Sequence, residues 1–400
     1  MSLKNPAAAV DTQSWGDVAR IDDPVYSGAS FMRSRFIAVL PLLVAGLSTT
    51  AAAQAGESPF SFHAAINAGA GVSGKLPILG IPSFGTFDYR TAALQFRYRL
   101  DNSDQFVVQL VNRRLGLSPL QAALPDVALQ WAYWQRRGRL GTIKVGRNPM
   151  PRGIFNETRF VGTVLPFFRP SFEVYGEGRE TVDGFVYSRT DPLGSGSLEL
   201  NVFGGSNEVR TQVVTATGNS IRAFRGNVFK GAQAWVNVAP GRTRFGGYFA
   251  QYRIDSARVY GWRHESLVSA ETHIVPRTVL RAEGLRIYGV GPKQDRKSGY
   301  VQGVFNVSEK FDIMSEMSLT NNRIFQNPPL SNVDVVATRD RALGVTYRIG
   351  GGALLRLERH DVSGYAFDQL VPLLSTVAGK SVVAPQSAGM YWLGSFAFSF

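Results

Sequence analysis

Arginine supplies most of the side chains in this sequence that could act on a ligand. Proline and phenylalanine in the segment 147–179 are interspersed with charged residues, which are Arg147, Arg152, Glu157, Arg159, Arg169, Glu173, Glu177 and Arg179. A guanidinium group stays charged and presents a donor fork that suits carboxylate or phosphate. In a narrow passage of low dielectric, such groups lower the energy of an entering anion, but conduction requires weak binding. The segment therefore predicts a preference for anions without tight capture.

The residues that enzymes commonly use form no recognisable pattern. The chain has no cysteine, which excludes a thiolate metal site and a cysteine nucleophile. Its histidines lack metal-site spacing and are His63, His264, His273 and His360. Ser269 precedes His273 by four residues on one strand, about 13 Å away, so a Ser–His pair would need two strands. With no G-x-S-x-G motif either, we expect no catalytic residue and no metal.

A glycine-rich stretch, GAGVSGKL at 69–76, matches most of a phosphate-binding loop. Its last position is Leu76, where a hydroxyl that binds Mg²⁺ is needed. The following PILGIPSFG cannot form the helix whose N-terminus would hold a phosphate. We interpret the stretch as a loop after a strand and expect no nucleotide and no other cofactor.

The elements that would position the arginines are strands with a two-residue period. In TAALQFRYRL, residues 91–100, Arg97 and Arg99 face away from Leu94 and Phe96. The final ten residues, YWLGSFAFSF, alternate in the same way, with aromatic side chains on one face and small ones on the other. One face suits lipid and the other suits water, which is the pattern of transmembrane barrel strands.

Sixteen strands of this kind are predicted, separated alternately by short turns and longer loops. Their ranges are 59–70, 91–100, 104–114, 126–136, 140–147, 179–189, 196–205, 228–238, 242–254, 263–274, 276–288, 298–307, 310–319, 340–349, 352–362 and 388–400. In the strand 126–136, one apolar face is expected to hold Val127, Leu129, Trp131 and Tyr133. An even strand count with this loop rhythm predicts an all-β fold, a transmembrane antiparallel β-barrel with short periplasmic turns. A soluble β-sandwich, which also alternates, is the other reading.

The N-terminus predicts export. Residues 32–55 begin with arginines, continue with about 12 apolar residues and end on small residues, as a secretory signal peptide does. We interpret residues 1–31 as a non-native or misassigned N-terminal extension and residues 56–400 as the barrel. No stretch after residue 55 is long and apolar enough for a membrane helix.

In a barrel, the long segment 147–179 joins the fifth and sixth strands, and we expect it to fold into the lumen as a constriction. The alternation also assigns charged residues to the lumen wall, namely Arg97, Arg99, Arg113, Lys144, Arg281, Glu283, Arg356 and Glu358. Two alternatives stay open: the loop could lie over the mouth of the barrel, and the wall charges could pair across strands. The spread of arginine along many strands gives no compact patch for nucleic acid.

The sixteen-strand layout resembles the trimeric porins of Gram-negative outer membranes. The stretches GRNPMPRGIFNETR, FFRPSF and VDGFVY, in about 145–187, are similar to the phosphate-selective porin O/P group. The resemblance implies a homotrimer with three pores, a basic constriction, and a C-terminal phenylalanine that signals insertion. Phosphate-specific members carry lysine clusters, whereas lysine is scarce among the 43 basic residues of this chain.

We therefore expect an outer-membrane channel for passive diffusion of small hydrophilic solutes, with a preference for anions. The expected surroundings are the lipid bilayer and lipopolysaccharide. A channel selective for phosphate-like or carboxylate anions is the alternative, and a barrel hydrolase or adhesin is a more distant one. Sixteen strands favour a channel because they enclose an open lumen, whereas a structural anchor needs only eight.

Overall fold

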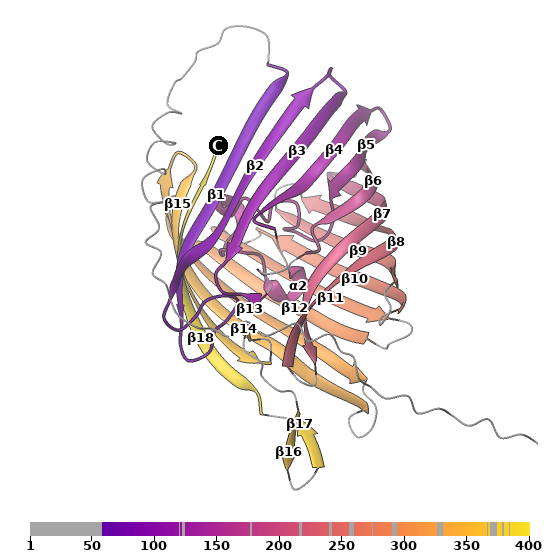
Figure 1. The fold of residues 1–400 in the computed structure, drawn as a ribbon. Coiled ribbons are helices and arrows are strands. Elements are labelled where there is room, and N and C mark those ends of the chain that lie inside the picture. The colour runs from indigo at the N-terminus through magenta and orange to yellow at the C-terminus, as the bar shows by residue number, and fades with distance from the viewer. Residues whose placement is uncertain are drawn as a thin grey trace, which may run out of the picture. The chain divides into compact units, whose positions relative to one another are not determined.

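The computed structural model describes residues 58–400 apart from residues 120, 122–124, 177, 216–217, 240–241, 256–259, 274, 290–293, 326–330, 366, 369–373, 378–379 and 384. In this part of the chain, sixteen antiparallel strands close into a barrel (Figure 1). Neighbours in sequence are neighbours in the wall, and the first strand pairs with the last, with Ile66 opposite Phe398. The predicted transmembrane barrel of sixteen strands is confirmed.

The barrel strands are β1 Phe60–Ser73, β2 Thr86–Arg99, β3 Asp104–Leu115, β4 Val127–Gly138, β5 Gly141–Pro149, β6 Thr181–Leu193, β7 Gly196–Thr215, β8 Gly218–Ala239, β9 Thr243–Asp255, β10 Tyr260–Thr272, β11 Thr278–Gly289, β12 Gln294–Asn306, β13 Phe311–Phe325, β14 Ser331–Gly350, β15 Ala353–Gly364 and β18 Ser387–Ser399. A separate hairpin consists of β16 Leu374–Val377 and β17 Lys380–Val383. Within the described residues, the connection between β5 and β6 holds a 3₁₀ turn, Gly162–Val164, and α2, Phe172–Tyr175. None of the helices in the described residues is long and apolar enough to cross a membrane.

The two faces of the wall follow the alternation. Along β18 and the residue that follows it, Trp392, Phe396 and Phe400 are 38%, 41% and 46% exposed on the outside, whereas Leu393 and Ala397 are buried. An outward apolar surface is stable against lipid and unfavourable against water. Aromatic rings gather near the short turns. For example, the ring centroids of Phe62 and Phe400 lie 5.7 Å apart.

The bulge between β3 and β4 corrects one predicted face. Gln109 pairs with Trp131 but Leu110 pairs with Leu129, so β4 has one extra residue at this point. An extra residue reverses the face of every residue beyond it. Trp131 therefore turns inward and is 7% exposed, while Leu129 stays outside. The prediction that Trp131 and Tyr133 share the face of Leu129 was wrong.

The predicted rhythm of short and long connections holds only in part. Several strands extend well past the predicted ranges, so β7 ends at Thr215 and β8 begins at Gly218. Long connections remain after β1, β3, β5 and β15. Hydrophobic alternation identifies the part of a strand inside the membrane but fades where both faces meet water.

Candidate functional site

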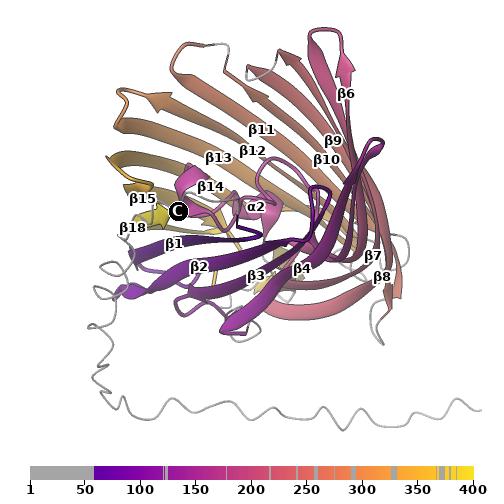
Figure 2. The same cartoon turned by 90° about the horizontal axis from the view of Figure 1, so that it is seen from above.

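The connection between β5 and β6, residues 150–180, folds into the barrel, and we call it the lumen loop. Figure 2, a view from above, shows α2 surrounded by the ring of strands. Polar contacts tie the loop to distant parts of the wall: Arg152 to Glu265 of β10, Arg296 of β12 to the Glu173 carbonyl, and Arg356 of β15 to two loop carbonyls. The predicted folding of the long loop into the lumen is confirmed.

Aromatic and aliphatic side chains of the lumen loop fill one side of the barrel. Phe155 and Tyr175 are 4% and 0% exposed and pack with Leu267 and Leu285 of the wall. Phe167 packs with Met314 in a second cluster. Burying such rings contributes about 1.5–3 kcal/mol each, so the loop is a fixed part of the interior.

Arg152 is the most enclosed charge of the loop. It is 1% exposed, and its Nε donates to Glu265 Oε1 at 2.5 Å while Nη2 donates to the Val174 carbonyl at 2.8 Å. Burial alone would lower the pKa of Arg152, but the adjacent Glu265 carboxylate outweighs this and raises it. Arg179 Nη1 also contacts Glu265, at 3.3 Å. One buried carboxylate thus holds both ends of the loop.

Glu180, at the end of the lumen loop, is the centre of a second buried charge cluster, together with Arg113 and Arg159. Its Oε1 lies 3.1 Å from Arg113 Nη1 and 3.6 Å from Arg159 Nη2. Burial would raise the pKa of Glu180, but the Arg159 and Arg113 charges outweigh it and lower the pKa to about 2. Arg159 also donates to the Gly176 carbonyl at 2.6 Å.

Glu173 and Tyr175 connect α2 to the opposite wall. Glu173 is 3% exposed and accepts from Ser318 Oγ at 2.9 Å; its pKa is raised by burial and then by the nearby Asp340. Tyr175 Oη donates to Glu283 Oε2 at 2.5 Å. Burial and the Glu283 charge raise the pKa of Tyr175, so it stays a neutral donor.

Gly153 makes the tight approach of loop and wall possible. Its φ is +63°, and a Cβ there would lie 2.5 Å from Tyr175 Oη and 2.6 Å from Glu283 Oε1. Only glycine adopts this backbone without strain and leaves room for that hydrogen bond.

The charged residues predicted for the constriction therefore lie in different surroundings. Arg152, Arg159 and Glu173 are buried and paired. Arg169 is half-buried, with its guanidinium carbon 5.4 Å from the centre of the Tyr89 ring. Glu157 is the one exposed charge among the described residues of the lumen loop.

Arg147 lies just before the loop, in β5. Its Nε is 3.7 Å from Asp183 Oδ1, and its side chain is 37% exposed. It is thus partly paired and partly open to solvent.

The lumen faces of β2 to β5, which we call the facing wall, carry cations that are not enclosed. Arg97 and Lys144 are half-buried and Arg99 is exposed. Lys144 Nζ lies 5.7 Å from the centre of the Tyr133 ring, and Tyr133 interacts electrostatically with both Glu157 and Arg97. At the turn end, a cavity of about 470 Å³ is lined by Arg97, Arg99, Arg137 and neighbouring polar residues.

The other predicted wall residues mostly hold the loop. Arg356 Nη2 donates to the Gly162 and Leu165 carbonyls at 3.0 and 2.6 Å, and Glu358 Oε1 accepts from the Phe168 amide at 2.5 Å. Arg113 and Glu283 serve the pairs described above. Arg281 instead joins a lumen-facing chain, with its Nε 2.5 Å from Glu271 Oε2.

Glu265 and Glu180 were not singled out from the sequence, although they organise these networks. Alternation along β10 indicates that Glu265 and Glu271 face inward, and this was the available signal. What the sequence could not show was which inward carboxylates the loop would reach.

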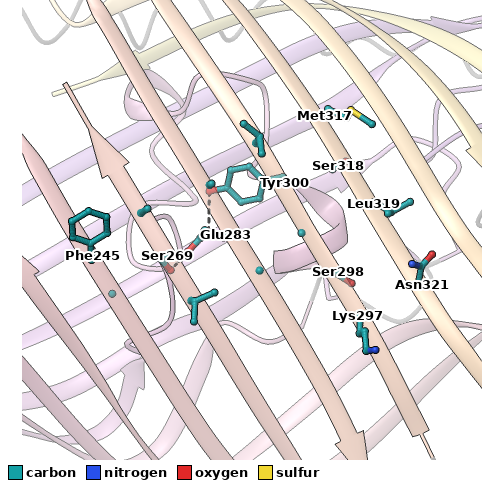
Figure 3. A pocket seen from close by; sticks show the side chains of 17 residues that line it. Phe245, Ser269, Glu283, Lys297, Ser298, Tyr300, Met317, Ser318, Leu319 and Asn321 are labelled. Atoms are coloured by element: carbon teal, nitrogen blue, oxygen red, sulfur yellow. Dashed lines mark hydrogen bonds between the residues drawn. The ribbon is translucent and has the colours of Figure 1, made fainter. Parts of the chain in front are cut away.

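A hollow of about 840 Å³ on the outer wall bears on the hydrolase alternative (Figure 3). Val268 and Val301, on its rim, are 66% and 62% exposed, and glycines of neighbouring strands form its floor. Behind it, Ser269 Oγ and Tyr300 Oη both donate to Glu283, at 2.5 and 2.8 Å. No histidine lines the hollow. Among the described residues, no group of three or more potential ligands could hold a metal ion.

Comparisons with known proteins agree on the fold. No protein-family model and no curated protein sequence matches the chain. Among solved structures, OmpT of Vibrio cholerae in its trimer form is similar over 85% of this chain and 99% of its own, with a TM-score of 0.52 and 12% identity. An anion-selective porin from Comamonas acidovorans covers 86% and 100%, with a TM-score of 0.53 and 10% identity.

OmpF of Salmonella typhi, in a complex with daunomycin, covers 85% of this chain and 97% of its own, with a TM-score of 0.56 and 10% identity. Such low identities establish architecture and leave the solute open. The chain has the sixteen-stranded β-barrel fold of Gram-negative outer-membrane porins.

Proposed function

We propose that this protein is an outer-membrane porin that lets small hydrophilic solutes diffuse passively. The observation that carries the proposal is the combination of a lipid-facing apolar surface with a lumen narrowed by a fixed loop. A barrel of this size encloses an aqueous channel. The solute gradient supplies the energy, so the account needs no cofactor.

We propose further that the passage lies between the lumen loop and the facing wall. Glu157 presents a carboxylate from the loop side, and Arg97, Arg99 and Lys144 present cations from the wall side. The buried arginines of the loop act as its anchors in this account. Net attraction for anions then comes from the facing wall and is opposed by Glu157.

Neutralising single charges tests this arrangement. A unit charge about 10 Å away in water changes the energies of an anion and of a cation by about 0.4 kcal/mol each, in opposite directions, which is about a factor of four in the anion-to-cation permeability ratio. Lys144→Gln is expected to lower the anion-to-cation permeability ratio by about that factor, and Glu157→Gln to raise it. Reversal potentials under a KCl gradient measure both. Arg136→Gln, outside the barrel at the turn end, is the matched control.

A channel with a preferred phosphate-like or carboxylate solute is the second candidate, favoured by the cavity that Arg97, Arg99 and Arg137 line. If this cavity holds such anions, millimolar phosphate would reduce the chloride current, and Arg137→Gln would remove the block. Unchanged chloride current in phosphate would leave general diffusion as the function.

The assembly and the processing of the chain are also proposals. We propose a homotrimer, consistent with the trimer form of the similar Vibrio cholerae protein. We propose that residues 32–55 are removed on export; these residues and 1–31 lie outside the described part of the chain.

A further inference from the structure

The barrel closes where β1 pairs with β18, and the side chains that meet across this seam are small. In its middle, Gly69 lies opposite Ser395 and Ala70 lies opposite Gly394. Contacts between cross-strand side chains contribute much of the stability of a sheet, and glycine weakens a strand. The backbone pairing of the seam runs without a bulge, but its side chains add little to that pairing.

The outer surface of the seam is poorly packed as well. A hollow of about 650 Å³ lies over it, and Ala68, Ala70 and Gly394 are among the residues that line this hollow. Its lining also includes Leu357 and Phe396, which are 48% and 41% exposed. The small side chains leave the space between these larger ones unfilled. Packing on the lipid side therefore contributes little to closure of the barrel.

The inner surface of the seam is covered by residues 162–168 of the lumen loop, which we call the latch. On β1, Asn67 Nδ2 donates to the Phe168 carbonyl at 2.9 Å. On β18, Ser399 Oγ shares a hydrogen bond with Thr163 Oγ1 at 2.7 Å. The latch is thus bonded to both strands of the seam.

The latch also contacts β15, the other neighbour of β18 in the wall. Arg356 donates to the Gly162 and Leu165 carbonyls. Glu358 accepts from the Phe168 amide. The Arg356 and Glu358 side chains are enclosed and form an ion pair, with Nε 3.8 Å from Oε1. Hydrogen bonds of charged groups are about twice as strong as neutral ones, so β15 gives the latch a firm attachment beside the seam.

The latch approaches the seam as closely as a glycine permits. A Cβ at Gly162 would lie 2.6 Å from Asn67 Cβ and 3.1 Å from Ala397 Cβ. At the other end of the latch, Phe168 is 4% exposed and packs with Leu393 of β18. Because the latch packs against both strands, β1 and β18 cannot separate without breaking their contacts with it.

We propose that the lumen loop has a second role, in which the latch holds the β1–β18 seam closed from inside the barrel. The seam has weak side-chain packing of its own, and the latch supplies hydrogen bonds to β1, β18 and β15. When the latch is displaced, β1 and β18 are the first strands to separate. This role concerns the wall and does not depend on which solute passes.

Amide hydrogen exchange of the full protein in neutral detergent tests the proposal, because exchange reports the local opening of a strand pair. Gly162→Ala should displace the latch and speed exchange of the β1 and β18 amides at least about tenfold, the factor that one hydrogen bond of a charged group contributes. Amides of β10 and β11, on the opposite side of the barrel, should keep wild-type rates. The matched control is Gly247→Ala, which adds a methyl group to a strand glycine in open space.

A milder variant keeps the test decisive if Gly162→Ala does not fold. Thr163→Val removes the hydrogen bond to Ser399 with little change of shape and should speed exchange at the seam about fivefold. Arg152→Met, which frees the β10 end of the same loop, should leave the seam at wild-type rates. Wild-type exchange at the seam in Thr163→Val, or in folded Gly162→Ala, would overturn the proposal. Equal acceleration in all strands, or at the seam in Arg152→Met, would also overturn it, because the loop as a whole would then stabilise the barrel.

Discussion

Removing Arg152 should loosen the lumen loop while leaving the barrel intact. Arg152→Met keeps an unbranched apolar stem but deletes the guanidinium group and its charge opposite Glu265. Both partners are almost completely buried, at 1% and 3% exposure. Deleting one partner of a buried ion pair leaves an uncompensated charge and costs about 3–5 kcal/mol.

That cost should fall on the loop rather than on the wall. The strands keep their hydrogen-bond ladders, for example the pairing of Glu265 with Ala250, whereas the loop can leave its seat. Arg179 stays 3.3 Å from Glu265 and offsets part of the loss. We therefore expect a folded barrel whose single-channel current is larger and noisier, and whose loop is cut faster by added protease.

Two further variants distinguish the effect of the Arg152–Glu265 ion pair from a general effect of removing charge. Arg152→Met/Glu265→Gln removes both charges of the pair but also takes the Glu265 carboxylate from Arg179, so it should recover only part of the loss. Arg189→Met disrupts an exposed pair with Asp191, with side chains 46% and 44% exposed, and should change neither current nor protection. Quiet wild-type currents and wild-type protection in Arg152→Met would refute the anchoring role.

Three other predictions concern residues of the loops. The pKa of Glu180 is about 2, against a usual value of 4.5. Ionised Glu180 should therefore stabilise the loop by about 3 kcal/mol above pH 4.5, and this stabilisation should be lost as the pH falls towards 2. Current noise recorded against pH measures the loss, and the noise of Glu180→Gln should not depend on pH. Burial raises the pKa of Asp368 to about 6, although the hydrogen bond from the Gly80 amide favours the carboxylate. Ionising this buried group as the pH rises through 6 should therefore destabilise its packed position and speed hydrogen exchange at the Gly80 amide, and Asp368→Asn should abolish that added pH dependence. Gly153→Ala should destabilise the loop by about 1–3 kcal/mol through strain and the lost hydrogen bond of Tyr175, measured by protease protection; wild-type protection would contradict it.

The sequence predicted the wall better than the interior. Alternation placed Phe396 and Arg97 on opposite faces because each strand residue senses either lipid or water. It failed at Trp131, where one bulge residue, which leaves no hydrophobic signature, reversed the face.

The lumen loop was predicted to enter the barrel, but the surroundings of its charges were not predictable. Whether Arg152 faces a solute or Glu265 depends on a contact across 113 residues, and periodicity carries no information about such pairs. The composition of the loop is basic, whereas the exposed charge among its described residues is the Glu157 carboxylate.

Planar-bilayer recording of the purified mature protein tests the central claim most directly. An open, water-filled passage predicts stepwise conductance, with a reversal potential on the anion side under a KCl gradient. Folded protein that inserts into the bilayer and gives no conductance steps would contradict the account.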